Sequence, residues 1–508
     1  MSKKGFFEEL VRTPDFVGFS THWIWIWCVF WSSLFYNTDA AKNTPALFHA
    51  LPIEALWATS LSSNVATLAV LLILSYRISS FFKYRSIMAV AAATTSIGTA
   101  LLSRPLGDML ATPELAANAY ILGGVLTGLG SAMIVVLWGE HFTSLGMRKT
   151  MGFCAASFIA AAPACFVIGL APAEFAQSVV SIMPIVSMLC LRRFRADSKG
   201  SDPRRVKAND ADVGKTPPKF APIIPLVGLS LFFGVSFGIM KGLLAPAEAG
   251  YIHLRDLLNI PAIVAGSLAI IIAAQVHKMS FDRLIYRMAM PIMALGFLFL
   301  PLSAPWGIFG TALHQFGYQY SYIALWTIWP FISAHNGIPA GRVTCWGILS
   351  IQAGQLIGST LGAAIASTDP TPFDMAMLAA FFIFVILISS LFAIDKTPSS
   401  YGWDLVKPGE DDNPAKKFDE VCAFVAERCK LSPREREVFL LLAKGRNRPY
   451  ICSELTISTE TAKTHIKNVY RKTGVHSHQE LLDMVEKRSK KRCVRHRFRN
   501  NQKEARNE

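Results

Sequence analysis

The stretch LSPREREVFLLLAKGRNRPYICSELTISTETAKTHIKNVYRKTGVHSHQELLDMVEK, residues 431–487, decides the fold of the C-terminal part of the chain. Apolar residues recur in it at helical spacing and predict four short helices. Ser432 and Glu435 form the S-x-x-E pattern of a capping box, so the first helix begins there. The third helix begins at Ser458 and runs to about Thr473.

The third predicted helix has two contrasting faces. Ala462, Ile466 and Val469 form its apolar inward face, whereas the outward face is polar and basic. A tight turn joins it to the helix before it. Two helices joined in this way, the second basic outside and apolar inside, have helix-turn-helix geometry. The alternative interpretation is a solvated amphipathic helix with an ordinary charged face.

The residues of this stretch also match a family pattern. The segments S-P-R-E-x-E-V-F, A-K-G and I-S-T-E-T-A-K-T-H-I-K-N-V-Y-R-K-T-G-V resemble the bacterial LuxR-type DNA-binding domain over about 57 residues. The resemblance implies that Lys463, Thr464 and Lys467 face base edges in the major groove, and that Thr461, His465 and Lys472 lie near phosphates. The implied partners are double-stranded promoter DNA, RNA polymerase and a second copy of the chain, in a homodimer on DNA.

Composition separates this module from the rest of the chain. The 508 residues are 52% hydrophobic and only 17% charged, yet the formal charge is +15. Such values exclude one large soluble globule and favour a membrane body with a separate basic part. None of the nine cysteines forms a C-x-x-C pair, so we expect reduced thiols and no metal site. No pattern indicates catalytic residues or a cofactor, so an enzyme is not expected.

A membrane body is predicted before the module. A spanning helix needs about 20 mostly apolar residues. Twelve such segments lie near 16–36, 55–75, 87–103, 119–140, 151–170, 174–191, 221–243, 258–276, 288–303, 308–334, 342–366 and 372–394. The charged stretch 192–219 divides them into six and six and is predicted to be a cytoplasmic loop.

Basic residues predict the orientation of these spans. With the N-terminus inside, the inside segments hold 21 Lys and Arg residues and the outside segments hold four. Lys and Arg are retained on the cytoplasmic side. We therefore expect a multi-pass protein of the inner (cytoplasmic) cell membrane with both termini in the cytoplasm.

Twelve spans in two sixes around a basic central loop resemble the major facilitator superfamily. The loops after spans two and eight, 76–88 and 276–290, are both basic, and Asp282 with Arg283 is the closest match to the short motif of that family. The resemblance implies two helical halves that rock around a cavity at the midplane of the membrane.

Polar residues within the spans are candidates for a ligand cavity, because polar groups in hydrocarbon are costly. The candidates come from spans one, ten and eleven: His22, Trp25, His314, Gln315, Tyr318, Gln319, Gln352 and Gln355. Together they predict a cavity for a small polar or aromatic ligand. For any single one, a structural hydrogen bond between helices is the alternative.

These observations predict an all-α protein: a polytopic bundle of twelve spans followed by a four-helix module. The expected parts are a membrane domain (1–394), a linker with a connecting helix (395–430), the DNA-binding domain (431–487) and a basic tail (488–508). From Lys487 onward the chain has ten Lys and Arg residues against two Glu. This tail either contacts phosphates or anionic membrane lipid, or is a disordered segment that adds solubility.

The predicted function is a one-component transcription regulator embedded in the membrane. Its spans would sense a small molecule, and its module would bind promoter DNA. The first alternative is a transporter of the major-facilitator kind with a regulatory DNA-binding tail. The second is a membrane anchor that holds the DNA-binding module without sensing.

Overall fold

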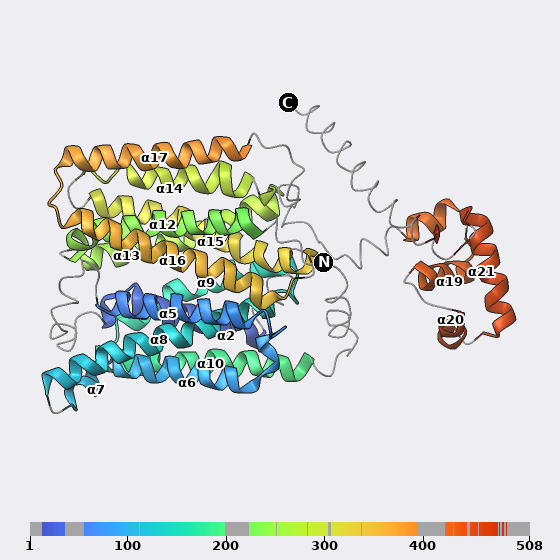
Figure 1. Cartoon of the computed structure of the whole chain (residues 1–508), viewed down its shortest axis with the longest axis horizontal. Coiled ribbons are helices and arrows are strands. Elements are labelled where there is room, and N and C mark those ends of the chain that lie inside the picture. The colour runs from blue at the N-terminus through green and yellow to red at the C-terminus, as the bar shows by residue number, and fades with distance from the viewer. Residues whose placement is uncertain are drawn as a thin grey trace. The chain divides into compact units, whose positions relative to one another are not determined.

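The computed structural model is helical in both parts of the chain (Figure 1). It describes residues 13–35, 55–110, 112–198, 223–249, 251–281, 283–302, 306–336, 338–394, 422–429, 431–443, 448–455, 457–475, 477, 480–481 and 484. No strand occurs among these residues. The chain forms two compact units, Met1–Asp411 and Asp412–Glu508. The predicted all-α fold is confirmed.

Twelve helices of the first unit, eleven of them long, correspond in order to the twelve predicted spans. The first six are α2 (Pro14–Phe30), α5 (Ala55–Leu74), α6 (Arg85–Leu101), α8 (Pro113–Phe142), α9 (Met147–Gly169) and α10 (Ala173–Ser198). The second six are α12 (Ile223–Ala249), α13 (Ile252–Ile271), α14 (Met290–Phe297), α15 (Trp306–Asn336), α16 (Ala340–Ala366) and α17 (Pro372–Ile394). Short elements lie between them: η1 (Ser33–Phe35), η2 (Phe81–Lys83), α7 (Arg104–Asp108), and two π-helical segments, η3 (Ile272–Val276) and η4 (Arg283–Ala289).

Seven of the described helices are long and apolar enough to cross a membrane, judged by length and composition alone. These segments are Ala55–Leu74, Pro113–Phe142, Met147–Gly169, Ala173–Arg193, Leu226–Leu244, Leu257–Val276 and Ala340–Ala366, and Pro372–Ile388 is a shorter apolar helix. Helices α2 and α6 have 17 residues each, which is at the lower end of the usual length of a span. Helix α15 carries several polar side chains within its apolar sequence.

Several helix ends differ from the prediction. Helix α8 begins six residues before the expected start at 119, and α10 runs on to Ser198, so the first residues of the predicted loop 192–219 are helical. The first span was expected over 16–36, but α2 ends at Phe30. The Ser32 hydroxyl donates to a carbonyl one turn back, and such local bonds compete with helix continuation. The ninth span was expected over 288–303, but it begins as a π-helix and ends earlier. Pro291 has no backbone N–H and interrupts the hydrogen-bond ladder there.

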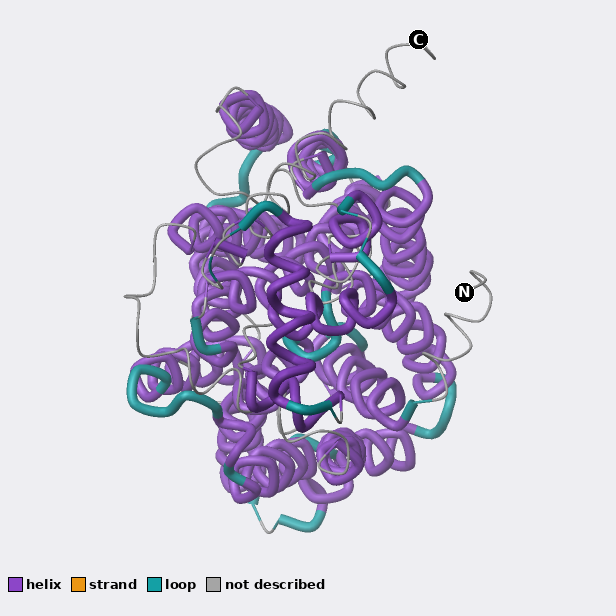
Figure 2. The backbone as a smooth tube through the Cα atoms, turned by 90° about the vertical axis from the view of Figure 1, so that its right-hand side faces the viewer, coloured by secondary structure: helices purple, strands orange, loops and turns teal. Residues whose placement is uncertain are grey.

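The first unit is built from two halves of six helices. In the first half α8 packs against α5 and α6, and α2 packs against α9 and α10. In the second half α12 packs along α16, and α15 lies between α13 and α14. The halves meet where α16 contacts α5 and α8, and where α9 contacts α13 and α15. Figure 2 shows many of these helices nearly end-on, as purple rings.

Glycines bring α12 and α16 into backbone contact. A Cβ atom added at Gly358 would lie 2.3 Å from the carbonyl oxygen of Val235, closer than real side chains approach. Gly354 and Gly362, one turn away on either side, have equivalent contacts with α12. The predicted face of three glycines at four-residue spacing therefore packs against a neighbouring helix, as small residues do in membranes.

The second unit has its own hydrophobic core. Its described helices are 422–428, α19 (Pro433–Ala443), α20 (Arg448–Leu455) and α21 (Thr459–Thr473). The core side chains are Cys422, Val425, Ala426, Leu431, Val438, Phe439, Leu442, Ala443, Ile451, Ala462, Val469, Val475 and Leu481. The predicted central loop from 199 onward, the linker from 395 to 421 and the tail 488–508 lie outside the described residues.

Candidate functional site

The capping box predicted at the start of α19 is present. The backbone N–H of Ser432 donates to Glu435 Oε2 at 2.8 Å, and the backbone N–H of Glu435 donates to Ser432 Oγ at 3.3 Å. These reciprocal bonds satisfy two donors that a helix N-terminus leaves unpaired. Helix α19 therefore begins where the sequence places it.

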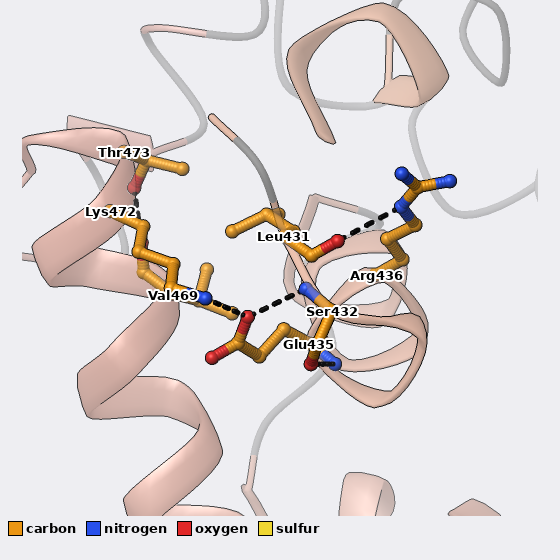
Figure 3. Close-up of polar contacts among 7 residues, drawn as sticks. All are labelled: Leu431, Ser432, Glu435, Arg436, Val469, Lys472 and Thr473. Carbon is orange, nitrogen blue, oxygen red and sulfur yellow. Dashed lines mark hydrogen bonds and ion pairs between the residues drawn. The ribbon is translucent and has the colours of Figure 1, made fainter. Parts of the chain in front are cut away.

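The same carboxylate also ties α19 to α21. The ammonium of Lys472 donates to Glu435 Oε2 at 2.6 Å (Figure 3). The Glu435 side chain is 7% exposed and the Lys472 side chain 32%. This bond from Lys472, together with the one from the Ser432 backbone, holds the pKa of Glu435 below its usual value. One buried carboxylate thus fixes α21 against the start of α19.

Helix α21 is bounded by a cap at each end. The Thr461 N–H donates to the Oγ of Ser458 at 3.2 Å, so Ser458 is the N-cap. Gly474 follows the last turn with φ of +71°, and its N–H bonds to the Tyr470 carbonyl. This left-handed conformation is costly for residues other than glycine. The predicted third helix is confirmed in both position and length.

The three residues expected to face base edges share the outward surface of α21. Lys463, Thr464 and Lys467 are exposed, whereas Ala462 is buried on the opposite side. Lys467 lies four residues after Lys463 and three after Thr464, spacings that place side chains on one side of a helix. The helix therefore presents two cations and a hydroxyl on a single face. The two ammonium groups suit the acceptor groups of a DNA major groove, whereas the Thr464 hydroxyl donates to the Glu460 carbonyl of its own helix at 3.0 Å.

The three residues expected to lie near phosphates differ from one another. Thr461 is exposed, and its hydroxyl lies 2.8 Å from that of Ser458. His465 is half-buried. Lys472 forms the ion pair with Glu435, although an ammonium has three N–H donors and can bond to more than one acceptor.

Two of the candidate cavity residues lie in the first half of the membrane unit. The rings of His22 and Trp25 are fully buried and stack with centroids 5.9 Å apart. Trp25 Nε1 donates to the Thr99 hydroxyl of α6 at 2.8 Å. Neither ring nitrogen of His22 has a hydrogen-bond partner among the described residues. His22 therefore carries two buried polar atoms that the described protein does not satisfy.

The other six candidates lie in the second half, on α15 and α16. His314 Nε2 is 3.1 Å from the Ser236 hydroxyl of α12, and Gln355 Nε2 donates to the Tyr318 hydroxyl at 2.7 Å. Buried Gln315 also belongs to this group. Two side-chain atoms have no hydrogen-bond partner within the described ranges: Gln319 Nε2 and Gln352 Oε1.

Aromatic rings connect the two groups across the boundary between the halves. Trp23 of α2 meets Tyr322 of α15 edge-on, with ring centroids 5.4 Å apart. The rings of Tyr322 and Tyr318 stack with centroids 5.7 Å apart, and the ring centroid of Tyr318 lies 4.4 Å from that of Phe237 in α12. Trp23, Tyr322 and Phe237 were not among the predicted site residues. Trp23 and Tyr322 lie in spans one and ten, the spans that supplied most of the predicted candidates.

A lysine lies at the same boundary. Lys241 of α12 places its ammonium 3.9 Å from the ring centroid of Trp57 and 5.5 Å from that of Trp31. It also bonds to the Phe30 carbonyl oxygen at 3.4 Å. Lys241 is one of the four basic residues predicted to lie in the outside segments. A lysine within an otherwise apolar helix was the available signal.

Comparison with known proteins separates the two units. The family model described as bacterial regulatory proteins, luxR family, matches residues 430–485. The spore germination protein GerE of Bacillus subtilis is 45% identical over 60 residues, which are 11% of this chain and 81% of GerE. The probable transcriptional regulatory protein NarL of Mycobacterium tuberculosis is 39% identical over 74 residues, 15% of this chain. This chain spans 33% of the length of NarL.

The membrane unit is similar in structure to a transporter. The proton:xylose symporter XylE of the major facilitator superfamily, in a complex with 6-bromo-6-deoxy-D-glucose, superposes with a TM-score of 0.58. The match covers 80% of this chain and 98% of XylE, at 12% sequence identity. This likeness shows the fold: a helical membrane unit of the major-facilitator kind is fused to a LuxR-type helix-turn-helix domain.

Proposed function

Since the chain belongs to the luxR family of bacterial regulatory proteins, we propose that it is a membrane-embedded transcription regulator whose helix α21 contacts promoter DNA. The single observation that carries this proposal is the exposed face formed by Lys463, Thr464 and Lys467, opposite a packed and buried face. Thr461, His465 and Lys472 then lie toward the phosphates. RNA polymerase and a second copy of the chain are the proposed protein partners.

Binding to DNA by the full-length protein in detergent micelles tests this proposal. The probe is a duplex selected from a random library by the wild-type protein. Replacing both Lys463 and Lys467 with Ala should weaken binding to the selected duplex by about 2 kcal/mol or more, roughly 30-fold. Arg434→Ala is the control, because Arg434 is an exposed basic residue of α19 paired with Glu437. An unchanged footprint in the double variant would contradict the assignment of α21.

The proposal includes a small-molecule ligand that binds where the two halves of the membrane unit meet. Support comes from His22, Gln319 and Gln352, whose side chains contain buried polar atoms without partners in the described part of the chain. Such atoms destabilise a folded protein unless something bonds to them. A ligand that binds two arrangements of the halves unequally would shift their populations. The ratio of 21 to four basic residues supports an inner-membrane location with both termini in the cytoplasm.

Transcription measured with and without the gene, across a panel of small molecules, tests for sensing. We expect one panel member to change transcription in the wild type and to lose its effect in His22→Leu. His277→Leu should respond like the wild type, because His277 is exposed at the end of its span. A full response in His22→Leu would remove His22 from the ligand site.

Transport is the second candidate function, and the transporter-like fold of the membrane unit is the observation that favours it. Sealed vesicles containing the purified protein separate the two functions. Accumulation of the molecule that alters transcription would support transport. Binding of that molecule without accumulation would support a sensor.

A further inference from the structure

Two cysteines from different spans lie in contact in the first half of the membrane unit. Cys28 of α2 and Cys165 of α9 are 137 positions apart in the sequence, yet their Sγ atoms are 3.3 Å apart. Both are free thiols. Each lies near the end of its helix, two residues before Phe30 and four before Gly169.

The surroundings of the pair determine what can reach it. Cys28 is 1% exposed, whereas Cys165 is half-buried and is the accessible partner. The residues next along α9, Phe166 and Val167, are 42% and 64% exposed. Exposed apolar side chains on a spanning helix face lipid. A reagent dissolved in the lipid therefore has the shortest route to Cys165.

We propose that Cys28 and Cys165 form an oxidation site, at which a lipid-soluble quinone converts the two thiols into a disulfide between α2 and α9. The S–S bond forms as both S–H bonds break. The two electrons and two protons pass to the quinone, which leaves as the quinol. The reaction needs no other oxidant.

The geometry requires only a small movement. A disulfide bond is about 2.05 Å long, so the sulfur atoms must approach by roughly 1.2 Å. Rotation about the Cα–Cβ bond of a cysteine can move its sulfur atom by a distance of this order. The pair is therefore placed for a disulfide within one molecule.

The disulfide would also fix aromatic residues near the boundary of the halves. Trp23 of α2 contacts Phe158 of α9, with ring centroids 4.6 Å apart. Trp23 also contacts the ring of Tyr322. Joining α2 to α9 covalently limits movement between these rings. This consequence for the ligand site rests on the proposed function, whereas the oxidation itself does not.

Peptide mapping of the full-length protein tests the oxidation directly. The protein is reduced, reconstituted in lipid vesicles and treated with decylubiquinone, whose fully substituted ring has no position open to thiol addition. We expect a cross-linked peptide pair containing Cys28 and Cys165, lighter than the separate peptides by two hydrogen atoms. Two maleimide-reactive thiols should be lost in parallel.

Single substitutions provide the controls. Cys165→Ser should abolish the cross-linked pair, whereas Cys190→Ser, which removes another half-buried thiol of the same half, should leave it unchanged. Peptide mapping of the wild type still tests the proposal even if a variant folds poorly. Unmodified Cys28 and Cys165 after treatment, or cross-links only between other cysteines, would overturn the proposal. A cross-link without any effect on transcription would retain the oxidation site and reject its link to sensing.

Discussion

Replacing Gly358 with Ala should push α16 away from α12 and destabilise the membrane unit. The added Cβ would lie 2.3 Å from the Val235 carbonyl oxygen and 2.9 Å from the Ile239 amide nitrogen. Ordinary contacts begin at 3.4 Å, so the helices must separate by about 1 Å. Both contacted atoms belong to the backbone and cannot rotate away. Overpacking of this kind costs about 1–3 kcal/mol.

A matched glycine provides the control for this substitution. Gly228 lies in the interior of α12 with no atom within 4 Å of an added Cβ. Alanine is favoured over glycine in a helix by about 1 kcal/mol, so Gly228→Ala should stabilise slightly. The measurement is helicity against increasing SDS fraction in mixed micelles, for both variants and the wild type. Equal or greater stability of Gly358→Ala would refute the backbone contact between α12 and α16.

Three further predictions concern the C-terminal unit. The pKa of Glu435 is lowered chiefly by the bond from Lys472. The ion pair therefore stabilises the unit above about pH 4.5, and this stabilisation is lost as the pH falls through the lowered pKa. Thermal unfolding of a 412–508 fragment should therefore show Glu435→Gln to be less stable at pH 7 and less sensitive to pH below 4.5; parallel pH profiles would contradict this. Ser458→Ala removes the α21 N-cap and should lower the free energy of unfolding by about 0.5–2 kcal/mol. An unchanged free energy of unfolding would mean that the cap does not form. Removing 489–508 should weaken binding to all DNA sequences alike and flatten its salt dependence in titrations, whereas a loss confined to the selected duplex would exclude phosphate contacts by the tail.

Local sequence patterns were sufficient to predict the C-terminal module. Ser432 and Glu435 are three residues apart, so their mutual bonds are visible in the sequence as a capping box. The bond from Lys472 to the same carboxylate could not be predicted, because the partners are 37 positions apart. Its existence depends on how α19 and α21 pack, which no local pattern specifies.

In the membrane unit, too, local sequence patterns predicted the helices but not the contacts between them. Hydropathy predicted twelve spans in two sixes, because burial in lipid requires long apolar segments whatever their partners. It also drew attention to His22 and Gln355 as polar groups within spans. It could not predict that Gln355 bonds to Tyr318, whereas His22 lies in the other half with both nitrogens unpartnered among the described residues. Which polar group is satisfied depends on contacts between helices.

Lys241 forms a contact between the two halves of the membrane unit that must break when the halves separate. Its ammonium belongs to the second half, and the rings of Trp57 and Trp31 belong to the first. Separating the halves at this end breaks a cation–π contact of about 0.5–2 kcal/mol, which lowers the population of the separated arrangement by roughly 2- to 30-fold. A ligand that stabilises the separated arrangement must first compensate for this difference through its own contacts. For the sensing function that we propose, a smaller ring at position 57 would therefore allow a response at lower ligand concentration.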